Sequence, residues 1–285
     1  MKRTAILVPA IVLIVLVGGL FPCPPVSGAS DQVLLRLSDR REVRLHEAVY
    51  DWKSVKVVLV GELHNEKKHH EIQLEVIRAL HNTGLQVAVG MEMFRRESQG
   101  VLDEWVRGTL SEAAFQRAYY DNWNSPWPLY ADIFHYAREK KIPIVGLNVS
   151  REITRQVAEK GFASLGEKQK KDLPPVSCAV DESYRKFIRR AMGIHGHQGM
   201  NFNNFCEAQI LWDAAMAWHT VQYLKAHPQR TVVILAGNGH AWKPGIPKQL
   251  EALSGYSCRV ILPHMPGKSD RDSATDQDAD YLWIE

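Results

Sequence analysis

The sequence has few cysteines and none of the short motifs that mark several common enzyme classes. It contains four cysteines in 285 residues and no CxxC pair, so neither a disulfide framework nor a zinc knuckle is indicated. Cys178, Cys206 and Cys258 allow at most one bridge, and the sequence does not select the pair. GxGxxG, Walker A, GxSxG and CxxCH motifs are missing. Dinucleotide redox chemistry, P-loop chemistry, a serine α/β-hydrolase and c-type haem attachment are therefore disfavoured.

The chain also has little net charge, and part of its positive charge lies in an N-terminal leader. The formal net charge is +3. Lys2 and Arg3 precede an apolar run from Ala5 to Phe21, and Ser27-Gly28-Ala29 offers small residues for cleavage, which is the pattern of an export signal. Without residues 1–29 the net charge is +1. A nearly neutral chain gives no electrostatic reason to bind nucleic acid.

The leader predicts an exported protein, located in the periplasm or anchored to the membrane at the cell envelope. Cleavage before Ser30 is the first interpretation. Retention of residues 1–29 as a membrane anchor is the alternative, since the apolar run of about 17 residues is at the lower limit for spanning a bilayer. Lipidation of Cys23 is a third interpretation, although Phe21-Pro22 before it makes a poor lipobox.

Short apolar runs rich in valine and isoleucine alternate with segments of helical length along the rest of the chain. The predicted strands are 33–37, 42–45, 56–60, 86–89, 142–147, 231–236, 258–262 and 281–284. The predicted helices are 66–82, 97–120, 130–140, 150–160, 181–192, 202–226 and 246–253. This alternation predicts one α/β domain over residues 30–285, with a predominantly parallel sheet, helices on both faces, a small N-terminal hairpin and a polar linker at 266–279.

Four ionisable side chains follow three of these strands directly: Glu62, His64, Glu92 and His240. The carboxyl ends of parallel strands meet at the edge of the sheet where ligands bind, so we expect the four to converge. Carboxylate and imidazole can together hold a divalent metal, and they can also abstract a proton from water and orient it. Any one of them could simply be a polar turn residue, and only their convergence favours a site.

Polar residues on the predicted helix 66–82 can support that site. His69 lies on the apolar stripe of the helix and is interpreted as a histidine of the core. His70 and Gln73 share the neighbouring face and can reach the site.

The predicted helix 202–226 carries a carboxylate among apolar residues. Asp213 needs a partner if it is buried, and Gln209, one turn earlier, is its local partner. A structural hydrogen bond and a role in supporting the site both remain open.

Two loops have the composition that a porphyrin pocket needs. Residues 123–130 are aromatic and interrupted by prolines, and residues 193–199 are rich in glycine and include His195 and His197. Apolar aromatic walls with a histidine or tyrosine ligand suit haem. The same compositions are common in surface loops, and the sequence does not show that these two loops meet.

Several separate motifs follow one another along residues 32–284: Gly61-Glu-Leu-His64, His69-His70 with Gln73, Gly90-Met-Glu-Met-Phe94 with Gln99, Leu147-Asn148, Ala208–Ala217, Ala236–His240 and Gly245-Ile-Pro247. Together and in this order they resemble the ChaN-like family of haem-binding proteins, within a wider group that includes erythromycin esterases and Tiki/TraB-type proteins. The resemblance implies a parallel α/β fold and a role in haem or iron uptake at the bacterial envelope.

The same resemblance suggests ligands and partners. It implies haem as cofactor, with a tyrosine and a histidine near the iron, for which Tyr130 and His195 are the candidates. It leaves open a homodimer with haem between its subunits, and an outer-membrane receptor or transport system as partner. The wider group instead implies hydrolysis, in some members with a metal, through residues that match Glu62, His64, Glu92 and His240. The sequence therefore predicts a haem-binding envelope protein, with a hydrolase as the alternative.

Overall fold

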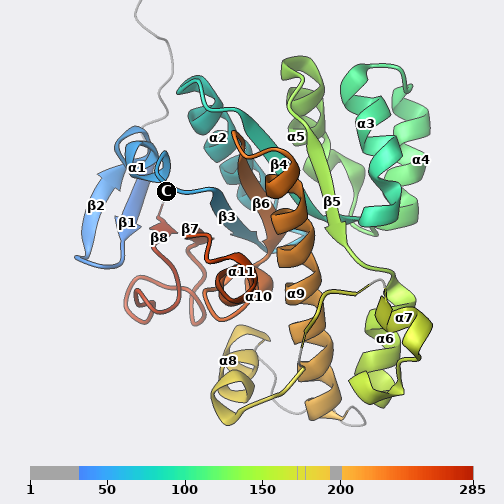
Figure 1. Cartoon of the computed structure of the whole chain (residues 1–285). Coiled ribbons are helices and arrows are strands. Elements are labelled where there is room, and N and C mark those ends of the chain that lie inside the picture. Colours follow the sequence, from blue (N-terminus) through green and yellow to red (C-terminus); the bar gives the residue numbers. More distant parts are fainter. Residues whose placement is uncertain (1–31, 172, 177, 193–200, 285) are drawn as a thin grey trace, which may run out of the picture. The chain divides into compact units, whose positions relative to one another are not determined.

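The computed structural model describes residues 32–171, 173–176, 178–192 and 201–284 (Figure 1). The leader 1–29, with Cys23, lies outside the described residues, as do His195 and His197, so the interpretations of these segments stay predictions. Among the helices that are described, none is both long enough and apolar enough to cross a membrane.

The strands of the described chain form one sheet that is parallel over most of its width. Their bounds are β1 Val33–Arg36, β2 Arg41–Arg44, β3 Val57–Glu62, β4 Val87–Arg95, β5 Ile144–Asn148, β6 Thr231–Gly237, β7 Cys258–Pro263 and β8 Tyr281–Trp283. The order across the sheet is β2-β1-β8-β7-β3-β6-β4-β5. β1 pairs antiparallel with β2 and with β8, and the other neighbouring pairs are parallel. The predicted α/β class with an N-terminal hairpin is confirmed.

Within the described residues, the helices lie close to their predicted positions, with one division and three additions. Their bounds are α1 Leu45–Trp52, α2 Lys67–Asn82, α3 Gln99–Arg107, α4 Glu112–Asn122, α5 Trp127–Lys140, α6 Arg151–Lys160, α7 Glu167–Lys171, α8 Glu182–Met192, α9 Phe202–Ala226, α10 Asn238–Ala241 and α11 Ile246–Ser254. The single helix predicted over 97–120 is wrong. Gly108 adopts a left-handed conformation with φ of 87° and ends α3, so a second helix follows. The sequence did not predict α1, α7 or α10.

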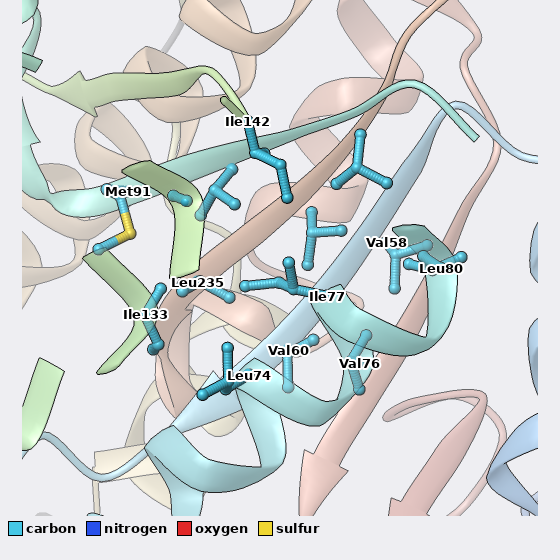
Figure 2. Close-up of a cluster of buried hydrophobic side chains, with 14 of the residues drawn as sticks. Val58, Val60, Leu74, Val76, Ile77, Leu80, Met91, Ile133, Ile142 and Leu235 are labelled. Atoms are coloured by element: carbon cyan, nitrogen blue, oxygen red, sulfur yellow. The ribbon is translucent and has the colours of Figure 1, made fainter. Parts of the chain in front are cut away.

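Apolar side chains on both faces of the central strands hold the helices against the sheet. On one face Val58 and Val60 of β3 pack in a cluster with α2 and α5. Figure 2 shows this cluster between strand and helix, with Leu74 and Ile77 of α2 and Ile133 of α5. On the other face, neighbouring residues of the same strands pack against α9, α10 and α11. Alternation of side chains along each strand therefore supplies both cores.

The long helix α9 is buried over most of its length because it packs on two sides. Met216 and Val221 face the sheet, whereas Cys206 and Leu211 belong to a separate cluster with α6 and α8. This explains why α9 is apolar nearly all round.

The segment 266–279 is polar in composition but is attached to the rest of the domain. Ser269, Ala274 and Ala279 are buried, and Arg190 of α8 binds the Asp278 carboxylate through both terminal nitrogens at 2.9 and 3.1 Å.

The strand order brings the functional residues together. β3, β6, β4 and β5 are consecutive neighbours and run in the same direction, so their carboxyl ends lie side by side. Glu62 ends β3, Gly237 ends β6, Glu92 lies near the end of β4, and Asn148 ends β5. Because these strands are separated in sequence by whole helices, only the parallel topology places the four ends at one edge.

Candidate functional site

Glu62 is a buried carboxylate that is surrounded by hydrogen-bond donors. Gln73 Nε2 donates to its Oε2 at 2.7 Å, and the Tyr130 hydroxyl donates to its Oε1. His64 Nδ1 lies 2.6 Å from Oε1, and His70 Nε2 lies 3.5 Å from Oε2. Burial alone would raise the pKa of Glu62, but the hydrogen bonds and charges of His64 and His70 lower it to about 2. Glu62 therefore stays ionised and holds the groups around it.

His64 is the partner of Glu62 that reaches the surface. Its side chain is 40% exposed, and its ring meets Trp123 edge-on, with centroids 4.9 Å apart. Burial lowers the pKa of His64, but the hydrogen bond to Glu62 and the charge of Glu92 raise it above 6.5 overall. The other edge of the ring lies over Gly237, where a Cβ would be 2.9 Å from Cε1 and 3.0 Å from Nε2. Glycine at position 237 thus lets the imidazole approach the backbone of β6.

Glu92 is the carboxylate between the two halves of the site. It is buried in β4, and its Oε2 accepts the Gly237 N–H at 2.6 Å. His240 Nε2 lies 3.7 Å from Glu92 Oε1. The charge of Glu92 acts on both His64 and His240, and it raises the pKa of each imidazole.

His240 is positioned by Asp213, a carboxylate of α9. Its Nδ1 lies 2.6 Å from Asp213 Oδ1, and the Tyr184 hydroxyl of α8 donates to Asp213 Oδ2 at 3.4 Å. Gln209 as the partner of Asp213 is therefore wrong, because the tertiary fold supplies an imidazole instead. Burial lowers the pKa of His240, but the charges of Glu92 and Asp213 raise it to about 9. Burial raises the pKa of Asp213 to about 6.

A pocket of about 400 Å³ opens beside His64 and Glu92. Its apolar and aromatic lining comes from Met93, Trp123, Val149 and Trp212. Its remaining lining is polar and consists of Arg95, Asn122, Asn124, Ser125, Asn148 and Arg151. The pocket thus combines indole surface, amide groups and cations next to an imidazole and a carboxylate.

Comparison with known proteins identifies the family. A family model described as haem-binding uptake, Tiki superfamily, ChaN matches residues 48–250. The chain belongs to the ChaN family. No curated protein matches its sequence.

Among solved structures, the chain is similar to the ChaN protein of Campylobacter jejuni, from a structure of cofacial heme binding. The two share 20% identity over 89% of this chain and 96% of that one, with a TM-score of 0.68, which shows a ChaN fold. A mutant of the erythromycin esterase EreC in its open conformation is also similar, at 14% identity over 76% of this chain and 72% of that one, with a TM-score of 0.47.

The ChaN fold brings together the four strand-end residues that the sequence singled out, but as pairs. Glu62 holds His64, and His240 lies between Asp213 and Glu92. Within the described residues, no group of three or more histidine, cysteine or acidic side chains is arranged to hold a metal ion. The divalent metal considered from the sequence is therefore not supported.

The two haem-ligand candidates have different positions. Tyr130 is buried in α5 with its hydroxyl bound to Glu62, so an iron ion would have to replace that carboxylate as its partner. His195 lies outside the described residues. Both assignments stay predictions.

His69 is buried and its Nδ1 accepts the Leu63 N–H at 2.8 Å, which agrees with its interpretation as a core residue. His70 and Gln73 lie beside Glu62, as the helical spacing indicates.

Sequence reasoning missed one wall of the pocket. Asn148 donates to the Glu92 carbonyl at 2.7 Å and accepts the Trp212 indole N–H, and Arg95 lies beside it at the end of β4. Asn148 had a signal, since it directly follows an apolar strand. Arg95 had none, because an arginine that ends a strand is ordinary on a protein surface.

Proposed function

We propose that this chain binds haem in the bacterial cell envelope and handles it during haem or iron uptake. The match of the ChaN family model over residues 48–250 carries the proposal. The predicted export signal in residues 1–29 supports the location. In this role the protein works in the periplasm or anchored to the membrane, as a homodimer, and exchanges haem with an outer-membrane receptor or transport system.

The residues of the pocket fit a haem. Bound haem supplies an iron whose reactivity depends on its axial ligand and surroundings. Trp123 and Trp212 offer aromatic surface for a porphyrin, and His64 is the imidazole of the pocket. Arg95 offers a guanidinium whose buried Nε has no hydrogen-bond partner within the described residues. Because Glu62 binds His64 Nδ1, the ring is held in one orientation with its other nitrogen left for a ligand.

A haemin titration of the purified full-length protein tests this function. The wild type should give a saturable shift of the Soret band. His64→Ala should weaken binding by roughly tenfold or more, because the carboxylate-oriented imidazole is lost. His264→Ala, which removes an exposed imidazole elsewhere, is the matched control and should bind like the wild type. Wild-type protein that gives no saturable shift, as monomer or dimer, would overturn the proposal.

A hydrolase is the second candidate, favoured by the arrangement of two carboxylate–imidazole pairs around Glu92. Glu62 with His64 lies on one side of Glu92, and Asp213 with His240 lies on the other. Carboxylate–imidazole pairs of this kind are used for proton transfer.

The roles within such a hydrolase follow from burial and charge. Glu92 is placed to accept a proton from an attacking water, because the raised pKa of each neighbouring imidazole favours its protonated form. His64, which is half exposed at the pocket, is placed to donate a proton to the leaving group. Glu62 and Asp213 hold the imidazoles and touch no substrate. No metal is required for these steps.

Hydrolysis of a panel of aryl esters and amides tests this candidate. Activity should be insensitive to chelators, and it should fall more than roughly a hundredfold in Glu92→Gln and His64→Ala. It should also decline as the pH rises through the pKa of His64, which lies above 6.5, because His64 then loses the proton it donates. A wild type without activity on every substrate, or two variants with full activity, rules the candidate out.

A further inference from the structure

Arg95 stands at the point where β4 ends beside the pocket. Its register partner on β5 is Asn148, and the pairing of β4 with β5 shifts between Met91 and Arg95. The Arg95 backbone N–H donates to Asn122 Oδ1 at 3.0 Å, which fixes the end of the strand against the C-terminal end of α4. An irregularity of this kind commonly re-aims a side chain near a functional site. Here it accompanies a guanidinium in the wall of the pocket.

The guanidinium of Arg95 has no partner in the described part of the chain. Its Nε is buried without a hydrogen bond, and no carboxylate lies within ion-pair distance of its side chain. The exposed Glu152, at the start of α6, has a lowered pKa chiefly because of its hydrogen bond with Ser150, and the charge of Arg95 adds a smaller contribution. By contrast, Arg190 is bound at both terminal nitrogens by Asp278. An unpaired buried donor is costly, so an arginine in this state is suited to an anion from outside.

The second arginine that lines the pocket, Arg151, already has hydrogen-bond partners within the protein. Arg151 donates through Nη1 to Asn124 Oδ1 at 3.3 Å and through Nη2 to the Asn122 carbonyl at 2.5 Å. These bonds hold the loop that carries Trp123 against α6. Arg151 therefore shapes the wall of the pocket, whereas Arg95 is the cation left for a ligand.

We propose that Arg95 binds a carboxylate of the ligand, and that the pocket therefore selects anionic over neutral ligands of the same shape. The ligand class is an apolar or aromatic body, which contacts Trp123 and Trp212, with a carboxylate at one edge. A guanidinium suits this group because its N–H donors match a carboxylate in geometry and charge. The inference rests on the proposed haem function, in which the carboxylate is a propionate of the porphyrin.

Two porphyrins that differ only in charge test the proposal. Haemin carries free propionates, and haemin dimethyl ester has the same ring and iron without them. Each is titrated into the full-length protein in the same detergent at the same ionic strength. Wild type should bind haemin roughly tenfold to a hundredfold more tightly than the ester. Arg95→Gln should lose most of this preference through weaker haemin binding, with little change in binding of the ester.

The controls separate charge recognition from folding. Arg96→Gln removes the next cation along the chain, which is exposed and bound to Gln99, and should keep the wild-type preference. Arg95→Lys keeps the charge without the planar fork and should retain part of the preference. Thermal unfolding of each variant shows whether the fold is intact. Even if a variant unfolds, equal affinity of the wild type for haemin and its dimethyl ester would overturn the proposal.

The outcomes distinguish the inference from the function on which it rests. Tight binding of both porphyrins with equal affinity by the wild type overturns the role of Arg95 and leaves haem binding standing. An unchanged preference in folded Arg95→Gln overturns it as well. A wild type that binds neither porphyrin contradicts the proposed function itself.

Discussion

At the scale of single residues, the site depends on one buried carboxylate and on one glycine, whose lack of a side chain leaves space. Glu62 accepts hydrogen bonds from α2 and α5 while it holds His64, so three elements fix the imidazole through one group. Gly237 gives the space into which the His64 ring fits. A buried charge is tolerated here because several donors surround it.

Gly237→Ala tests this arrangement. The backbone of Gly237 has φ of −53°, which alanine adopts without strain, but the new methyl group would lie 2.9 Å from His64 Cε1. We expect the half-exposed ring to move away from Glu62, so the pKa of His64 should fall back toward 6.5. An NMR titration of the histidine ring protons measures this. Gly100→Ala, with nothing within 4 Å of its added methyl, is the control, and an unchanged His64 titration in Gly237→Ala would contradict the model of a glycine-dependent site.

At the scale of elements, the pair β4–β5 shapes the pocket. Both strands end there, and the irregular register between Met91 and Arg95 turns the end of β4. Gly146 of β5 makes the close approach feasible, and its N–H donates to Gln99 Oε1 at 3.1 Å, which ties β5 to α3.

Gly146→Ala should separate these two strands. Its Cβ would lie 2.6 Å from the Arg95 carbonyl oxygen, which is backbone and has little freedom to move. We expect the free energy of unfolding to fall by about 1–3 kcal/mol, as for other overpacked cores. Urea denaturation measures this loss. Gly100→Ala on α3 has open space and should be neutral or slightly stabilising, so equal effects of the two substitutions would refute the steric explanation.

At the scale of the whole molecule, the ionised groups of the site couple stability to pH. Glu62 has a depressed pKa, so its contribution is complete above pH 4.5 and is lost as the pH falls toward 2. His240 has a raised pKa, so its contribution is complete below pH 6.5 and is lost as the pH rises through 9. Asp213 has a pKa raised to about 6, so its contribution to stability is also lost as the pH rises, through about 6. The two main limits place maximum stability between about pH 4.5 and 6.5.

Urea denaturation between pH 3 and pH 10 checks this dependence. The free energy of unfolding should drop by about 2 kcal/mol between pH 5.5 and pH 3 on account of Glu62. Glu62→Gln should be less stable than the wild type at pH 5.5 and should lose this part of the acid dependence, because glutamine cannot titrate. An acid limb as steep in Glu62→Gln as in the wild type would assign the effect to other carboxylates.

The sequence by itself determined the α/β class, most of the elements and the strand-end residues. These follow from local patterns, since apolar runs of strand length alternate with helical segments and the predicted apolar runs are followed by Glu62, His64, Glu92 and His240. It could not place α1, α7 or α10, and it joined α3 and α4 because the conformation of Gly108 is not visible in a hydrophobic pattern. It also could not show that Asp213 binds His240, or that Arg95 lies unpaired in a pocket lined by two tryptophans. Those relations join residues far apart in the chain, and only the strand order and the packing of α9 against the sheet bring them within hydrogen-bond distance or into one pocket.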